Sequence, residues 1–184
     1  MIKQTLQFNF YYWQRLFVYF WVFSLVGHYF EVIWAYLISF TTGSSIWNPT
    51  TITLIPLAIP YGLGAVSVIL LVGNYAKNNN LNIWAVYFIS IISCSVIEYT
   101  CSAILVNIYG FNKYWDYSER LFNLNGYICL EASLLFGLLA TIFIYQIYPI
   151  FERYFNSLNR SYIDVAFWIM IISYSIDLIY YYSK

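Results

Sequence analysis

Charged residues are scarce in this chain. Only 9% of its 184 residues are Asp, Glu, Lys or Arg, the 8 bases balance the 8 acids, and 62% of the residues are hydrophobic. A soluble domain carries about a quarter charged residues, because its surface must be hydrated. The composition therefore excludes a soluble domain and indicates an integral membrane protein in contact with membrane lipids. It also excludes nucleic acid as a partner, since binding to phosphates needs clustered bases.

Cysteine and histidine are also scarce. The 3 cysteines lie in or beside apolar segments at no metal-type spacing, which argues against a disulfide framework. The single histidine, His28, has no second His or Cys at a zinc spacing, so we expect no metal. The sequence has neither a signal-peptide pattern nor a Gly-rich phosphate loop, so we expect the first apolar segment to remain as an anchor and no cofactor to bind.

Long apolar runs dominate the rest of the sequence. A spanning helix needs about 20 mostly apolar residues, and the runs lack the alternation of membrane barrel strands. Helices satisfy their own backbone polar groups in lipid. The sequence therefore predicts an all-α fold, a polytopic transmembrane helix bundle of about five spanning helices that forms a single integral membrane domain over 1–184. The expected spans are 16–40, 55–75, 83–108, 126–148 and 162–182.

The ends of two spans carry specific signals. Asn125 precedes Gly126 and is expected to cap the fourth span, and Pro149 is expected to stop it. Pro60, near the start of the second span, predicts an irregular or broken beginning there. More Lys and Arg fall on the N-terminal side of this topology than on the other, which predicts a cytoplasmic N-terminus, with the protein in the cell membrane.

Four acids lie more than one helical turn inside an expected span: Glu31, Glu98, Glu131 and Asp177. An ionised acid near a helix centre costs about 2.5 to 3.5 kcal/mol, so each should face the bundle interior, have a partner or be protonated. Glu31, Glu98 and Asp177 each follow the start of a span by 15 residues, about 22 Å of helix. Glu131 lies near the start of a span with the opposite direction. All four are therefore predicted in the same half of the membrane.

Helical spacing places small or polar residues beside these acids. Gly27 and His28 share a face with Glu31, whereas all 8 bases lie outside the expected spans. Such an acidic interior favours a bound cation, a hydroxyl-rich ligand or protonated carboxyls. The alternative is that the acids only hydrogen-bond helices together. His28 could join Glu31 as a metal ligand, although a satisfied buried histidine is the simpler interpretation.

Two further segments stand out. Gly62 and Gly64 predict a small-residue face on the second span that lets a neighbouring helix approach closely. The polar loop 114–120 contains Trp115 and has two interpretations. It is an interfacial loop with local turns, or a cap over the acids with Arg120 reaching a carboxylate.

The loop also carries a family resemblance. The run Trp115-Asp116-Tyr117-Ser118, followed by Asn123-Leu124-Asn125-Gly126, resembles the signature of the type IV ABC-transporter permease family, also called CmpB-like. The resemblance covers nearly the whole chain. Further matching positions are Gly27, Glu31, Pro56, Pro60, Tyr61, Gly62, Gly64, Glu98, Tyr99, Gly137, Pro149 and Asp177.

The resemblance implies a membrane component of a transporter. Because the chain has no phosphate loop, it also implies a separate ATPase subunit, and five slim helices suggest a homo-oligomer or a partner permease. Three positions depart from the family pattern: His28 and Phe136 replace Trp, and Tyr127 replaces Arg. Loss of that Arg removes a counter-ion for the acids, which argues against an anionic ligand.

Three functions remain open from the sequence. The first is a transporter component with an acidic chamber for a small solute or cation. The second is an intramembrane enzyme acting on a lipid, with Glu31, Glu98 and His28 as acid and base, although no nucleophile accompanies them. The third is a structural or regulatory membrane partner. Convergence of Glu31, Glu98 and Asp177 would support the first two.

Overall fold

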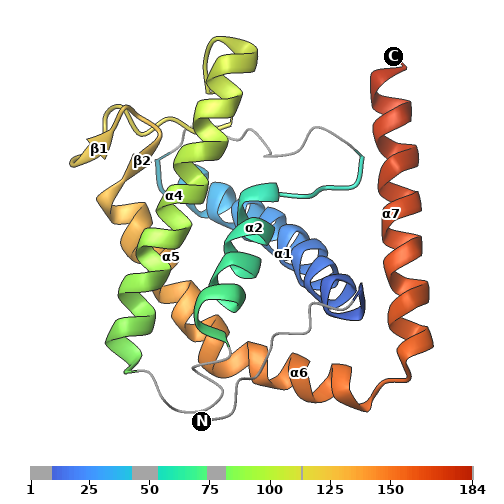
Figure 1. The fold of residues 1–184 in the computed structure, drawn as a ribbon. Helices are drawn as coiled ribbons and strands as arrows, with labels where there is room; N and C mark the ends of the chain where they lie inside the picture. The colour runs from blue at the N-terminus through green and yellow to red at the C-terminus, as the bar shows by residue number, and fades with distance from the viewer. Residues whose placement is uncertain (1–9, 43–53, 74–81, 113, 184) are drawn as a thin grey trace.

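The computed structural model describes residues 10–42, 54–73, 82–112 and 114–183, and these are almost entirely helical (Figure 1). The predicted all-α fold is confirmed. Two short strands, β1 (Asn123–Leu124) and β2 (Ile128–Cys129), form a hairpin between two of the helices. The helices are α1 (Phe10–Thr42), α2 (Ile59–Val68) with its π-helical end η1 (Ile69–Gly73), α4 (Ile83–Tyr109), α5 (Leu130–Ile142), the π-helical turn η2 (Phe143–Ile147), α6 (Tyr148–Ser157) and α7 (Arg160–Tyr182).

Four stretches in the described part of the chain are long and apolar enough to cross a membrane. The second expected span, 55–75, differs, because within the described residues its helix covers Ile59–Gly73. At 1.5 Å per residue this described stretch is about 22 Å long, shorter than the roughly 30 Å hydrocarbon core. It packs against both α1 and α4. The four long stretches are Phe10–Leu37, Ile83–Tyr109, Leu130–Ser157 and Arg160–Tyr182.

Local sequence sets the ends of α4 close to the prediction. The Asn82 side chain accepts a hydrogen bond from the backbone N–H of Trp84 at 3.1 Å and so caps the first turn. At the other end Gly110 adopts φ +79°, and its N–H donates to the carbonyl of Val106. This left-handed conformation favours glycine and ends the helix.

The predicted start of the fourth span is wrong. The helix begins at Leu130, and Asn125 with Gly126 instead turns the hairpin, where β1 pairs with β2. Both turn residues have positive φ, 56° and 71°. An Asn-Gly pair is a strong hairpin signal because both residues tolerate this conformation, so the same dipeptide that suggested a helix cap makes a turn.

Pro149 does not end the fourth span either. It lies in the first turn of α6, where a missing N–H costs little. The π-helical turn η2 directly precedes this helix, and such turns absorb irregularities within a longer helix. In Figure 1, α6 runs across one end of the bundle, between α5 and α7.

Part of the apolar core lies where α6 meets α1. Tyr19 of α1 is 1% exposed, and its ring lies 5.2 to 5.8 Å from the rings of Tyr148, Phe151 and Phe155. Elsewhere large apolar side chains point outward, as Trp168 does on α7. Outward apolar surface of this kind is expected of helices that face lipid.

Candidate functional site

Helices α1 and α2 approach closely through two glycines. A Cβ atom at Gly27 would overlap the ring of Tyr61, and one at Gly62 would overlap Ser24 and the backbone of Phe20. The close contact is strengthened by the N–H of Ala58, which donates to the carbonyl of Ser24 at 3.0 Å. As a result, the Tyr61 side chain lies directly against α1. Gly64, two residues further along, is less crowded, since its Cβ would meet only Cys94 Sγ at 3.6 Å.

Tyr61 connects α2 to the first of the acids. Its hydroxyl hydrogen-bonds to the Glu31 side chain, which is one helical turn beyond Gly27. The opposite side of the ring packs edge-on against Phe136 of α5, with 5.6 Å between centroids. The orientation of Glu31 is therefore coupled to the packing of three helices.

Glu98 of α4 is the second acid of the cluster and is 6% exposed. The Tyr117 hydroxyl donates to Glu98 Oε1 at 3.0 Å. Glu31 lies close enough to Glu98 for their charges to interact. We call Glu31, Tyr61, Glu98 and Tyr117 the paired-carboxylate site. Burial, together with the neighbouring Glu98 carboxylate, raises the pKa of Tyr117 well above its usual value, so this phenol remains a hydrogen-bond donor.

The loop that carries Tyr117 is held by its own polar residues. Asp116 Oδ1 accepts hydrogen bonds from the hydroxyl and the backbone N–H of Ser118, at 2.6 and 2.9 Å, and these lower the pKa of Asp116. The backbone N–H of Tyr117 donates to the carbonyl of Gly126 at 2.9 Å. A side chain at Gly126 would overlap Ser118. The hairpin thus packs directly behind Tyr117.

Three more of the predicted loop residues form hydrogen bonds that hold the loop and the hairpin together. Asn123 donates to the carbonyl of Arg120 at 2.8 Å and accepts from the N–H of Gly126 at 3.0 Å. Asn125 donates to the Tyr99 hydroxyl of α4 at 2.8 Å. The Trp115 indole N–H donates to the carbonyl of Tyr127 at 3.0 Å. The loop therefore lies over α4 and reaches Glu98 through Tyr117.

Asp177 occupies a different environment. It is 6% exposed, and its two oxygens accept the backbone N–H groups of Leu54 and Ile55 at 3.0 and 2.6 Å. The carboxylate thus holds the segment that enters α2 against α7. The structure gives it this anchoring role and does not join it to the paired-carboxylate site.

Glu131 does not face the bundle interior; of the three possibilities expected for the acids, it has a partner. Its side chain is 78% exposed and lies 3.7 Å from Arg120 Nη1. It is in the first turn of α5, where a negative charge interacts favourably with the helix dipole. Arg120 therefore reaches an exposed carboxylate at the hairpin and not the buried pair.

Several polar atoms on α1 and α4 are buried without a hydrogen-bond partner. They are Glu98 Oε2, His28 Nδ1, Ser24 Oγ and Ser90 Oγ. His28 is 8% exposed, and both serines are fully buried. Within the described part of the chain, no group of three His, Cys, Asp or Glu side chains is arranged to hold a metal ion.

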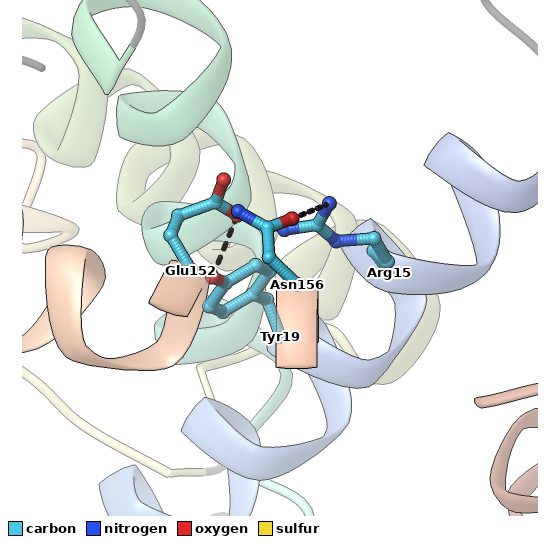
Figure 2. Close-up of polar contacts among 4 residues, drawn as sticks. All are labelled: Arg15, Tyr19, Glu152 and Asn156. Carbon is cyan, nitrogen blue, oxygen red and sulfur yellow. Dashed lines mark hydrogen bonds and ion pairs between the residues drawn. The ribbon is translucent and has the colours of Figure 1, made fainter. Parts of the chain in front are cut away.

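A second polar cluster, which the sequence patterns did not predict, lies toward the N-terminal end of α1. Arg15 forms an ion pair with Glu152 of α6, and these side chains are only 15% and 13% exposed (Figure 2). Tyr19 donates to the same carboxylate at 3.1 Å, and Arg15 reaches Asn156 at 3.4 Å. Arg15 was assigned to a flank because the first span was expected to begin at 16. The i, i+4 spacing of Arg15 and Tyr19 is the signal that could have placed both on one helix face.

We expect Glu152→Gln to lower the free energy of unfolding by about 1 to 2 kcal/mol, because it removes the negative partner of a largely buried guanidinium. Arg153→Gln is the matched control, since the neighbouring Arg153 side chain is exposed. The measurement is unfolding in detergent micelles followed by tryptophan fluorescence. Equal effects of the two substitutions would contradict a stabilising role for the ion pair.

Apolar spans, tight glycine contacts and buried polar clusters together define a helical integral membrane protein. The model of the family described as "Putative ABC-transporter type IV" (ABC_trans_CmpB) matches residues 18–182, so the chain belongs to this family. The resemblance drawn from the loop and glycine motifs is thereby confirmed. No curated protein and no solved structure matches the chain.

Proposed function

We propose that the protein is the membrane-embedded component of a transporter and that the paired-carboxylate site binds a small solute with a positive charge or hydrogen-bond donors. Family membership supports the transporter role. The observation that carries the binding role is Glu98, which accepts from Tyr117 through Oε1 while its Oε2 is buried without a partner. A buried acceptor left without a donor costs about 1 to 3 kcal/mol, and more when it is charged. A ligand that donates to Oε2 would recover this energy.

The setting we propose follows from the sequence and the family. The chain forms one domain in the cell membrane with a cytoplasmic N-terminus, since more Lys and Arg flank the spans on that side. Since the sequence has no phosphate-binding loop, ATP hydrolysis would come from a separate subunit. A homo-oligomer or a partner permease would complete the transport path.

The test is ligand binding by the purified chain in lipid nanodiscs. Ammonium, small alkylamines, sodium, potassium and a neutral polyol serve as probes, and the 7 tryptophans report unfolding. A ligand at a hundredfold excess over its Kd stabilises the folded state by about 2.7 kcal/mol. We expect at least one cationic or donor-rich probe to stabilise the protein, and Glu98→Gln to abolish that stabilisation.

Glu131→Gln is the matched control for this experiment. It removes the same charge on the same side of the bundle, but from an exposed side chain that lies outside the paired-carboxylate site. We expect it to leave the stabilisation unchanged. A response that persists in Glu98→Gln, or that both substitutions reduce equally, would overturn the proposed site.

A further inference from the structure

The titratable groups that interact with Glu98 come from α1, α2, the loop and α4 itself. Glu31 approaches from α1, Tyr61 from α2 and Tyr117 from the loop. On α4 itself, Cys94 and Cys101 are close enough to interact with its charge. Each of these described groups is neutral or negative, so none of them supplies a positive charge that would favour ionised Glu98.

Two carboxylates whose charges interact, one of them buried, do not both ionise easily. In a low-dielectric interior, like charges at short range favour retention of one proton by the pair. The two tyrosines supply one hydrogen bond to each carboxylate, Tyr61 to Glu31 and Tyr117 to Glu98. Those bonds leave the second oxygen of Glu98 to be satisfied in another way.

The second oxygen of Glu98 supports a bound proton independently of the charge interaction with Glu31. Glu98 Oε2 is buried and has no hydrogen-bond partner, and Ser90 Oγ, two turns earlier on the same face of α4, is fully buried and also without one. A divalent metal ion such as Ca²⁺ or Mg²⁺ needs several oxygen ligands at once. The described side chains do not offer a group of three His, Cys, Asp or Glu residues for that purpose.

We propose that the resident cation of the paired-carboxylate site is a proton, bound at Glu98 Oε2, and that solute binding releases it. The inference rests on the proposed function and names the exchange that occurs there. The proton comes from water. When the solute's donor group reaches Oε2, the O–H bond of the carboxylic acid breaks, the electron pair stays on Glu98, and the proton returns to water. Charge is conserved for a singly charged cation, because one positive charge replaces another.

Infrared spectroscopy of the chain in nanodiscs tests the resident proton directly. At neutral pH the wild type should show the carbonyl stretch of a protonated carboxylic acid. The band should be lost in Glu98→Gln and kept in Glu131→Gln. Absence of the band in the wild type would overturn the proposal without reliance on any variant. Tyr117→Phe adds a check that retains Glu98, because loss of the hydrogen bond to Oε1 should shift the frequency of the band, and an unshifted band would count against the assignment to Glu98.

Proton release separates this inference from the proposed function. In a weakly buffered solution with a pH-sensitive dye, each bound cationic solute should release about one proton. Solute binding without proton release would contradict the proposal of a resident proton, but it would still support the proposed solute site. A Glu98-dependent carboxylic acid band with no binding of any probe would support the proton site and overturn the proposed function.

Discussion

Replacing Asp177 with alanine is expected to lower the free energy of unfolding by about 3 kcal/mol. The carboxylate accepts two backbone N–H groups, those of Leu54 at 3.0 Å and Ile55 at 2.6 Å, from a side chain that is 6% exposed. Hydrogen bonds to a charged acceptor are worth about 1.5 to 3 kcal/mol each. Alanine removes both bonds, so the segment that enters α2 loses its attachment to α7. Unfolding in micelles, followed by tryptophan fluorescence, measures the loss.

Asp164→Asn provides the control on the same helix. Asp164 pairs with Arg160 one turn away at 3.9 Å, and both side chains are substantially exposed. Exposed pairs of this kind contribute little, so its replacement should change stability by less than about 0.5 kcal/mol. Asp177→Asn should also destabilise the protein, because its amide keeps one acceptor oxygen but places an NH2 donor against the second backbone N–H. A stable Asp177→Ala protein that loses only solute binding would return Asp177 to the role of ligand that the sequence suggested.

Sequence patterns predicted the positions of the helices along the chain better than the contacts of individual side chains. Long apolar runs predicted the helical class and the start of α4 at residue 83, since hydrophobicity and an asparagine cap act locally. The 33 residues of α1 extend beyond the expected span at both ends, and at the N-terminal end this is because aromatic residues at an interface continue the helix without being strongly apolar. The prediction consequently put Arg15 outside the helix, whereas it lies in the second turn of α1.

The acids show the limit of arguments from depth. Glu31, Glu98 and Asp177 have equivalent positions along their expected spans, yet the structure brings only the first two together. Depth follows from the rise per residue, whereas a partner depends on the rotation of each helix and on the loops around it. Asp177 accepts hydrogen bonds from the backbone of Leu54 and Ile55, and the periodicity of the spans does not predict where that segment lies. Glu131 shows the same limit, since its position near a span start did not predict its exposed face.

Alanine substitutions at two glycines of α2 should have different effects on the free energy of unfolding. Gly62→Ala is expected to lower the free energy of unfolding by about 2 to 3 kcal/mol, because its Cβ would overlap the Ser24 hydroxyl and the carbonyl oxygen of Phe20. The backbone oxygen cannot turn aside as a side chain can, so α1 and α2 must separate. Gly64→Ala should instead be neutral or stabilise by up to about 1 kcal/mol, since alanine favours the helix and its Cβ meets only Cys94 Sγ at 3.6 Å.

The same pair of variants tests how helix packing controls the site. Tyr61 directly follows Pro60 and precedes Gly62, and its hydroxyl hydrogen-bonds to Glu31 across the α1–α2 contact. Separation of the helices in Gly62→Ala should lengthen this hydrogen bond and weaken solute-dependent stabilisation, whereas Gly64→Ala should retain it. Both are measured in the nanodisc assay with the probe that stabilises the wild type. A glycine-to-alanine change alters helix propensity equally at residues 62 and 64, so only the overlap at Gly62 should make the two variants differ. Equal stability of the two variants would therefore contradict the close contact between α1 and α2.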